Sequence, residues 1–285
     1  MRVLVTGATG FIGRNLLAVL TADHEVFALT RGEVPDDRQE AHWIEEDLCS
    51  LRAASLPAQI DAVVHLAQSR RYREFPDGAA DMFAVNVEST FRLLEYARGA
   101  GAEIFVLAST GGVYGGSPAP ITEDDEIDPV GFYPASKAAA ETLASGYDSA
   151  LATVVLRFFF VYGPGQEKML VPSLIERVRS GDEIVIDGDP GLRMNPIHVC
   201  DAVQAFEPAL RLGRSDVFNV AGEEAVSITD LLGVIGQELG TEADVRHTDA
   251  EPPGDLVAAN RKLKDVLGVT PRISLAEGIR SMLQP

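Results

Sequence analysis

Cysteine is scarce in this sequence: two of its 285 residues, Cys49 and Cys200, carry a thiol. Two such cysteines form no disulfide framework, and neither belongs to a Cys-X-X-Cys pair or another spacing typical of zinc. So few thiols are typical of a reducing compartment. We therefore expect a cytoplasmic protein with no metal site.

Long apolar runs are also missing, so no segment is expected to cross a bilayer. The start of the chain places one basic residue, Arg2, before apolar ones, as a signal peptide does. Glycines at 7, 10 and 13 interrupt that run, and no small-residue cleavage site follows. A buried first strand is the better interpretation.

Positive charge is outnumbered, because 24 lysines and arginines face 43 acidic residues and give a net charge of −19. A surface this acidic repels nucleic acid and anionic membranes, so neither is expected as a partner. A small anionic ligand stays possible, since backbone amides and a few arginines can hold a phosphate locally. Hydrophobic residues make up 46% of the chain, which suffices for a proper core.

The first half of the sequence alternates apolar runs with helical patterns. The predicted strands are Arg2–Thr6, Glu25–Leu29, His42–Glu45, Ala62–Leu66, Ile104–Ala108 and Ala152–Phe158. Helices are predicted through Ile12, Leu16, Val19 and Leu20, through Phe91, Leu94 and Tyr96, and over Pro134–Tyr147. This alternation indicates βαβ units, and hence an α/β fold with a Rossmann-type doubly wound parallel sheet.

After Pro164 glycine and proline become frequent and the predicted helices shorter. Ser227 with Asp230, and Ser274 with Glu277, have the spacing of helix-capping boxes. Gly240 is a candidate C-terminal cap. We expect residues 1–164, joined by 194–222, to form the cofactor-binding Rossmann domain, and 165–285 mainly a smaller C-terminal α/β substrate domain.

A glycine loop follows the first predicted strand, with Gly7, Gly10 and Gly13 spaced GxxGxxG and with Phe11 and Ile12 between the last two. The pyrophosphate of a dinucleotide needs close backbone approach and the free amides of a helix N-terminus, which a Cβ would block. The alternative is a plain tight turn. The position directly after a buried strand favours binding of NAD or NADP.

The end of the second strand selects between these two cofactors. An acid there binds the ribose 2′-hydroxyl of NAD, whereas an arginine favours the 2′-phosphate of NADP. The strand ends Leu29-Thr30-Arg31-Gly32, without an acid. Arg31 therefore gives a slight preference for NADP, unless it stacks on adenine or faces solvent.

Tyr133 and Lys137 stand four residues apart, so on a helix they lie on one face. A neighbouring ammonium and an oxidised nicotinamide both favour the phenolate of such a tyrosine. Alone, the spacing is also typical of an amphipathic surface helix. Ser109 and Thr110 follow the fifth strand, at the sheet edge where ligands bind, and a hydroxyl there can bind a reacting oxygen.

With these residues assembled, the chain resembles the extended short-chain dehydrogenase/reductase family, in particular its nucleotide-sugar epimerase/dehydratase branch. The resemblance runs almost from end to end. The matching segments are Thr6–Gly13, Asp47–Leu48, His65–Ala67, Asn86 with the helix after it, Ser109–Gly115, Tyr133 with Lys137, and Leu156–Pro164.

The resemblance implies that Tyr133 is the acid–base, that Lys137 lowers its pKa and holds the nicotinamide ribose, and that Thr110 orients the substrate oxygen. It implies further cofactor contacts from Asp47, Leu48, Leu66, Ala67, Gln68, Asn86, Ser109 and Phe159. It implies substrate contacts from Thr110, Gly111, Phe160, Arg193 and Asn195. The nicotinamide would take a hydride from a sugar carbinol carbon, and an epimerase or dehydratase would return it later.

Some positions depart from the family's pattern. Gly111 and Gly112 replace the Asp-Glu pair of 4,6-dehydratases, and removal of water needs an acid and a base, so a standard 4,6-dehydratase is not expected. No cysteine lies near the catalytic hydroxyl, unlike in bifunctional epimerase–reductases.

On the substrate side, Phe160 replaces a phosphate-contacting asparagine and can only pack or stack. Arg193 is offset by one residue from the usual arginine, so either Arg193 or Asn195 is expected to face the ligand. Cys200 stands where an acid is common, while Asp201 is retained.

Three functions remain open. The leading hypothesis is C4 epimerisation of a nucleotide sugar with retained cofactor. The second is an NADPH-dependent ketoreductase acting on a keto sugar or small carbonyl compound, which Arg31 and Phe160 favour. The third is a cofactor-binding sensor or scaffold without catalysis, against which the intact Tyr133 and Lys137 argue. Relatives often dimerise through the helices corresponding to Asn86–Arg98 and Pro134–Tyr147, so a homodimer is expected.

Overall fold

The computed structural model describes residues 1–32, 34, 40–251 and 254–284. The chain divides into two compact units, and each is described by itself. The first unit comprises Met1–Val113, Ile127–Arg157 and Val203–Phe218, and the second comprises Tyr114–Glu126, Phe158–Ala202 and Asn219–Pro285. Neither unit is therefore a continuous half of the sequence. We expected residues 1–164 with 194–222 to bind the cofactor and residues 165–285 to bind mainly the substrate. This division of function stays a prediction.

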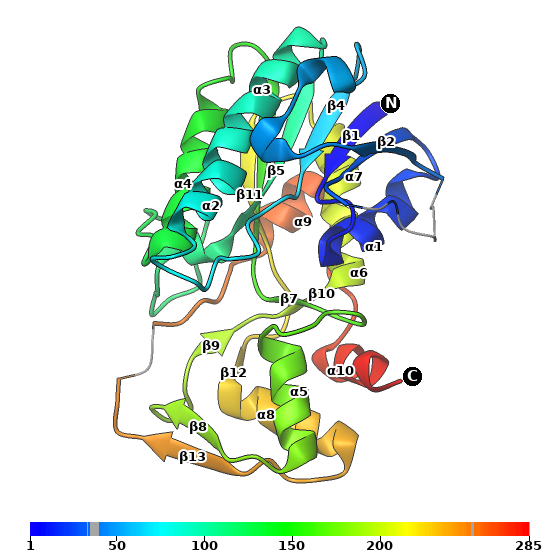
Figure 1. Ribbon diagram of the computed structural model, residues 1–285. Helices are drawn as coiled ribbons and strands as arrows, with labels where there is room; N and C mark the ends of the chain where they lie inside the picture. The colour runs from blue at the N-terminus through cyan, green and yellow to red at the C-terminus, as the bar shows by residue number, and fades with distance from the viewer. Residues whose placement is uncertain (33, 35–39, 252–253, 285) are drawn as a thin grey trace. The chain divides into compact units, whose positions relative to one another are not determined.

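A seven-stranded sheet in the order β11-β6-β5-β4-β1-β2-β3 organises the first unit (Figure 1). The strands are β1 (Arg2–Thr6), β2 (Glu25–Thr30), β3 (His42–Glu45), β4 (Ala62–His65), β5 (Ile104–Thr110), β6 (Ala152–Phe158) and β11 (Asp216–Val220). β1 pairs in parallel with β2 and with β4, and the pairs β2–β3 and β4–β5 are parallel too. The strand order reverses between β1 and β4, and such switch points are where doubly wound sheets bind ligands.

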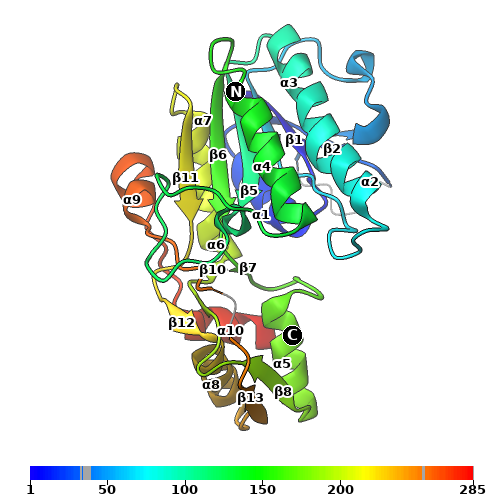
Figure 2. The ribbon, with the colours of Figure 1, turned by 90° about the vertical axis from the view of Figure 1, so that its left-hand side faces the viewer.

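Helices cover both faces of this sheet: Figures 1 and 2 show α3 and α4 on one face and α1 and α7 on the other. The helices of this unit are α1 (Phe11–Leu20), α2 (Ala79–Phe83), α3 (Ser89–Gly99), α4 (Phe132–Ser145) and α7 (Phe206–Leu210). The predicted Rossmann-type doubly wound sheet is therefore confirmed.

Burial explains why the central strands are apolar without interruption. Val3, Leu4 and Val5 of β1 are fully buried, because helices pack on both sides of the strand. Leu4 also belongs to an apolar cluster between the sheet and one helical layer, which includes Leu93 of α3 and Phe105 of β5. Each such side chain stabilises the fold by about 1.5–3 kcal/mol.

The second unit pairs its strands two by two. The pairs are β7 (Val161–Tyr162) with β10 (Ile197–His198), β8 (Ile184–Asp187) with β13 (Val245–Thr248), and β9 (Arg193–Met194) with β12 (Val226–Ser227). Its helices are α5 (Leu170–Ser180), α6 (Val199–Ala202), α8 (Ile228–Leu239), α9 (Arg261–Leu267) and α10 (Leu275–Leu283). An apolar core joins α5, α8, α10 and β8.

Both capping boxes expected in this unit are confirmed: Ser227 with Asp230 begins α8, and Ser274 with Glu277 begins α10. Gly240 ends α8 in the left-handed conformation, as expected. Among the described residues, none of the helices is long and apolar enough to pass through a membrane.

The predicted strands agree with the structure to within two residues. The helix expected to include Asn86 differs, because α3 begins only at Ser89. A five-residue π-helical segment, Ala84–Glu88, joins α2 to α3 and contains Asn86. π-Helical turns are often found at functional sites, and Asn86 is one of the residues for which a cofactor contact is predicted.

Candidate active site

The glycine loop lies between β1 and α1, as the sequence predicts. Gly7 has a φ of +67°, and a Cβ on Gly13 would lie 2.2 Å from the carbonyl oxygen of Gly7. Both positions therefore admit only glycine. Gly10 caps α1 without a side-chain hydrogen bond, so no side chain of the cap occupies the amides of Phe11 and its neighbours. An uncapped helix N-terminus at the sheet's switch point fits the pyrophosphate of a dinucleotide.

The residues expected near the adenosine half of the cofactor follow β2 and β3. Arg31 is exposed directly after β2. Asp47 accepts a hydrogen bond from the amide of Cys49 at 2.9 Å and so begins a 3-10 turn, in which Leu48 is buried. The carboxylate of Asp47 thus has a structural partner, and its contact with adenine stays a prediction.

Tyr133 and Lys137 lie on the first two turns of α4, as expected from their spacing. Lys137 is only 3% exposed, and this burial lowers its pKa to about 8, against the opposing effect of the Glu141 carboxylate. Burial also raises the pKa of Tyr133, and the neighbouring Tyr72 adds to the rise. The lowered pKa expected for Tyr133 is therefore not produced by the chain alone, because desolvation disfavours its phenolate.

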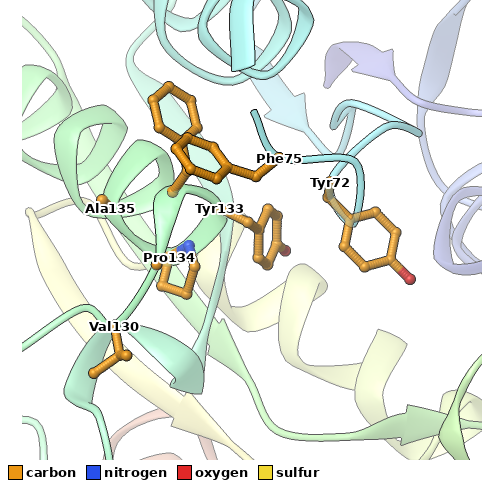
Figure 3. Close-up of a pocket in the computed structure, with 8 residues that line it drawn as sticks. Tyr72, Phe75, Val130, Tyr133, Pro134 and Ala135 are labelled. Carbon is orange, nitrogen blue, oxygen red and sulfur yellow. The ribbon is translucent and has the colours of Figure 1, made fainter. Parts of the chain in front are cut away.

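A pocket of about 650 Å³ opens beside Tyr133 (Figure 3). It is lined by Tyr72, Phe75 and residues 130–135. The rings of Tyr72 and Tyr133 have their centroids 5.4 Å apart, and Phe75 stacks on Phe132 at 5.5 Å. The Tyr133 hydroxyl donates a hydrogen bond to Oε1 of Gln68 at 2.9 Å. The structure thus brings together Gln68 and Tyr133, which are 65 positions apart in the sequence.

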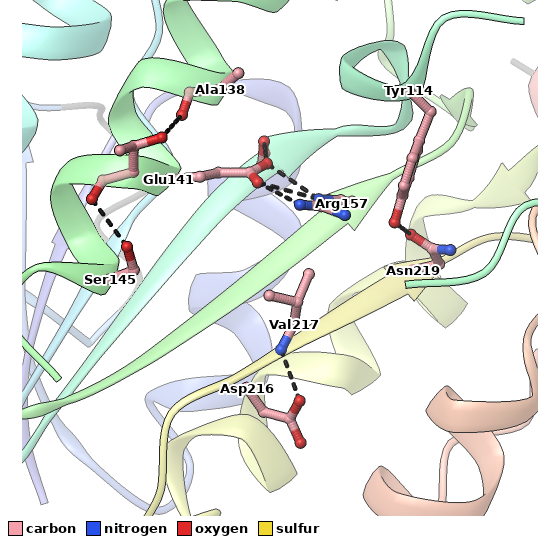
Figure 4. Close-up of polar contacts among 10 residues, drawn as sticks. Tyr114, Ala138, Glu141, Ser145, Arg157, Asp216, Val217 and Asn219 are labelled. Atoms are coloured by element: carbon pink, nitrogen blue, oxygen red, sulfur yellow. Dashed lines mark hydrogen bonds and ion pairs between the residues drawn. The ribbon is translucent and has the colours of Figure 1, made fainter. Parts of the chain in front are cut away.

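Ser109 and Thr110 are the last two residues of β5, at the carboxyl end of the strand, as the sequence predicts. The Thr110 hydroxyl accepts a hydrogen bond from the amide of Gly112 at 3.1 Å, within the short turn that begins at Gly111. The Ser109 hydroxyl instead donates to the buried carboxylate of Glu141, which Arg157 also binds (Figure 4). Ser109 therefore ties β5 to α4, and its expected cofactor contact stays a prediction.

Four predicted residues belong to the second unit, namely Phe159, Phe160, Arg193 and Asn195. Phe159 is buried and stacks on Tyr114 with centroids 6.2 Å apart. Phe160 adopts a φ of +43°, which is unusual for a residue with a side chain and marks local strain. Arg193 is exposed on β9.

Asn195 differs from these residues, because both the nitrogen and the oxygen of its side-chain amide form hydrogen bonds inside the second unit. It donates to the carbonyl oxygens of Gly222 and Ala258 at 3.0 and 2.9 Å, and it accepts from the amide of Ala258 at 2.9 Å. It is 3% exposed. The substrate contact predicted for Asn195 stays a prediction, and these bonds give it no support.

Sequence reasoning missed several residues that the structure places around Tyr133 and Lys137. Tyr72 and Phe75 come from a loop with no helical or strand periodicity, so no pattern in the sequence predicted that they line a pocket. Ser136 lies inside the Tyr133–Lys137 segment, where its hydrogen bond with Asn86 had no sequence signal. Glu141 could have been found, since it follows Lys137 at helical spacing.

Comparison with known proteins confirms the family resemblance. The model of the NAD dependent epimerase/dehydratase family matches residues 3–221. The UDP-glucose 4-epimerase of Mycolicibacterium smegmatis is 32% identical over 309 residues, covering 100% of this chain and 98% of that protein. A dTDP-4-dehydro-6-deoxy-D-allose reductase of Streptomyces sp is 32% identical over 278 residues, covering 88% of this chain and 85% of the reductase. The solved structure of MoeE5 in complex with UDP-glucuronic acid and NAD is 33% identical, with a TM-score of 0.87, and the match covers 99% of this chain and 97% of MoeE5.

Proposed function

The chain belongs to the NAD-dependent epimerase/dehydratase family, and on that premise we propose that it is a nucleotide-sugar 4-epimerase that retains NAD. The observation that carries the proposal is the arrangement on α4. Tyr133 presents its hydroxyl beside an open pocket, and the buried Lys137 follows one turn later. The UDP-glucose 4-epimerase of Mycolicibacterium smegmatis and MoeE5 each match this chain over nearly its full length.

When bound, NAD would supply the acceptor for a hydride from C4 of the sugar and the donor for its return. Tyr133 takes the proton of the C4 hydroxyl during oxidation and gives it back during reduction. Thr110 holds the same oxygen by a hydrogen bond. Lys137, with its pKa near 8, carries a positive charge over most of the neutral range and stabilises the phenolate.

The pocket supports a redox-neutral cycle rather than elimination of water. Its described lining contains no carboxylate and no imidazole, and the positions after Thr110 are Gly111 and Gly112. A 4,6-dehydratase needs an acid and a base at neighbouring carbons. A keto sugar that must rotate between oxidation and reduction, so that its other face receives the hydride, needs open space instead. The pocket offers such space.

NAD is proposed over NADP because of the relatives. The slight preference for NADP rested on Arg31 alone, and the similar MoeE5 was solved with NAD. Arg31 is exposed, which fits a residue beside the adenosine part of NAD or of NADP equally well. Mass spectrometry of nucleotides released from the denatured protein distinguishes the two cofactors, and NAD at near one equivalent is the expected result.

The experiment that tests the proposed function incubates the purified protein with UDP-glucose and with UDP-glucuronic acid, without added cofactor. Proton NMR follows the configuration at C4. We expect conversion of at least one of these sugars, and its loss in the variant Tyr133→Phe. Full activity of Tyr133→Phe would remove Tyr133 from the mechanism.

A ketoreductase is the second candidate, because the chain is also 32% identical to a keto-sugar reductase over most of its length. This function predicts an exchangeable NADPH and net consumption of the cofactor. Absence of epimerisation together with NADPH oxidation in the presence of a 4-keto sugar would favour it.

A homodimer through α3 and α4 remains our expectation for the assembly. Phe83, on the adjoining α2, and Phe91, on α3, are both about half exposed, and a dimer through these helices would cover them. A monomeric mass by light scattering at micromolar concentration would contradict a dimer.

A further inference from the structure

A chain of buried hydrogen bonds runs from the end of β1 to the start of α4. Thr6 Oγ1 lies 2.7 Å from Nδ1 of His65, and Nε2 of His65 lies 3.1 Å from Oγ1 of Thr90. Thr90 Oγ1 donates to the carbonyl oxygen of Asn86 at 2.8 Å. All four of these residues are at most 1% exposed, so water does not compete for the bonds.

The direction of every bond in this chain follows from counting hydrogens. Thr90 has a single hydroxyl hydrogen, and it goes to Asn86. The contact with His65 therefore requires Nε2 to be the donor. A neutral imidazole then leaves Nδ1 as an acceptor for the Thr6 hydroxyl, and Thr6 in turn accepts from the amide of Ala67 at 3.3 Å.

Burial and charge both keep His65 neutral, as this pattern requires. The surrounding protein lowers the pKa of His65 to about 3, mainly by desolvation and further by the positive charge of Lys137. A second proton would make Nδ1 a donor as well, so the Thr6 hydroxyl would have to turn its own hydrogen away from His65.

The side chain of Asn86 continues the chain toward the catalytic helix. Its Oδ1 accepts from the amide of Ser69 at 2.9 Å, and its Nδ2 donates to Oγ of Ser136 at 2.9 Å. Ser136 donates to the carbonyl oxygen of Tyr133 at 2.7 Å. Asn86, in the π-helical segment, thus contributes both its carbonyl and its side chain to this network.

We infer that His65 is a positioning residue, which as the neutral Nε2-protonated tautomer joins the dinucleotide loop after β1 to Tyr133 and Lys137 on α4. The link works through Thr6 and Ala67 on one side and through Thr90, Asn86 and Ser136 on the other. It fixes the distance between the loop after β1 and the acid–base pair on α4. The inference rests on the proposed function for the roles of Tyr133 and Lys137, but the tautomer of His65 does not depend on it.

The first test is nitrogen NMR on the full chain labelled with ¹⁵N-histidine. The chain has five histidines, and the variant His65→Gln identifies the signals of His65. We expect Nε2 protonated and Nδ1 unprotonated from pH 5 to pH 8. An Nδ1-protonated ring, or a ring that gains a proton within this range, overturns the inference.

The second test asks whether the network sets the ionisation of Tyr133. Thr90→Val removes the hydroxyl but keeps the shape of the side chain, and Thr90→Ser keeps the hydroxyl. Tyrosinate absorbance, corrected with Tyr133→Phe, is titrated with NAD bound. We expect Thr90→Val to raise the midpoint by about half a unit or more, because a displaced Lys137 stabilises the phenolate less. Thr90→Ser is expected to leave it unchanged.

Equal midpoints for Thr90→Val and Thr90→Ser would mean that the network only stabilises the fold, and would overturn the inference. If Thr90→Val does not fold, Ser136→Ala removes the last link instead and must raise the midpoint in the same way. The proposed function fails separately, by full epimerase activity in Tyr133→Phe, whatever the tautomer of His65.

Discussion

Arg157 on β6 binds Glu141 on α4 inside the protein: its Nη2 lies 2.7 Å and its Nε 3.1 Å from Oε2, and Nε also lies 3.2 Å from Oε1. Both side chains are less than a tenth exposed (Figure 4). Glu141 also accepts from Ser109 and lies one turn after Lys137. This ion pair therefore holds α4, which carries Tyr133 and Lys137, on the sheet.

Breaking the pair should cost much more than breaking a surface pair. Glu141→Gln leaves the buried guanidinium without its charge partner, so we expect the free energy of unfolding to fall by about 3 kcal/mol. Asp265→Asn breaks the exposed pair with Arg261 and should cost less than about 1 kcal/mol. Urea unfolding of both variants measures the two costs. Equal costs would contradict the structural function given to Glu141.

The buried ammonium of Lys137 should lower the stability of the folded chain. Its pKa is about 8 in the folded chain against an ordinary 10.5, so the unfolded chain binds the proton more tightly. Stability should therefore rise as the pH increases from 8 to 10.5, and the cost below pH 8 is at most about 3 kcal/mol. Lys137→Met should abolish epimerisation, raise the melting temperature at pH 7 and lack this rise. A lower melting temperature would mean that the ammonium makes a net stabilising contact.

His65 should make the fold sensitive to mild acid. Its folded pKa of about 3 lies below the ordinary 6.5, so the unfolded chain takes up the proton first. The stabilising contribution is complete above pH 6.5 and is lost progressively as the pH falls toward 3, by about 1.4 kcal/mol per unit. His65→Gln should show a shallower loss of unfolding free energy between pH 6.5 and 5. Identical slopes for the two chains would contradict a neutral His65.

Gly13 should be essential to the dinucleotide loop. A Cβ at this position would lie 2.2 Å from the Gly7 carbonyl oxygen, so Gly13→Ala must displace the loop. We expect NAD binding, measured by calorimetry, to weaken by at least about tenfold, since a misplaced loop loses more than about 1.4 kcal/mol of contact with the pyrophosphate. Gly233 on α8 has nothing within 4 Å of its Cβ position, so Gly233→Ala should leave binding unchanged and stabilise the helix by up to about 1 kcal/mol.

The sequence predicts the sheet well because its signals are local. A short apolar run such as Val3–Val5, bounded by glycines, favours a strand buried on both faces, and the glycines after it permit a turn that approaches a ligand closely. Both capping boxes were predicted from a local signal too, a serine followed three residues later by an acidic residue. Tyr133 and Lys137 could be predicted as a pair because helical spacing alone puts them on one face.

What the sequence could not predict depends on contacts between distant segments. The network of His65 needs Thr6, Thr90 and Ser136 to meet, and no periodicity links these positions. The raised pKa of Tyr133 arises from burial and from Tyr72, whose loop carries no regular pattern. The bonds of Asn195 likewise come from Gly222 and Ala258, which lie 27 and 63 positions away.

The most direct test of the account uses UDP-glucose that carries deuterium at C4, incubated with the purified protein without added cofactor. A hydride that is taken by retained NAD and returned to the other face must reappear at C4 of the epimer. We predict a C4 epimer that keeps its deuterium, and no such product from Tyr133→Phe. An epimer that has lost the deuterium to solvent would contradict hydride transfer as the basis of the reaction.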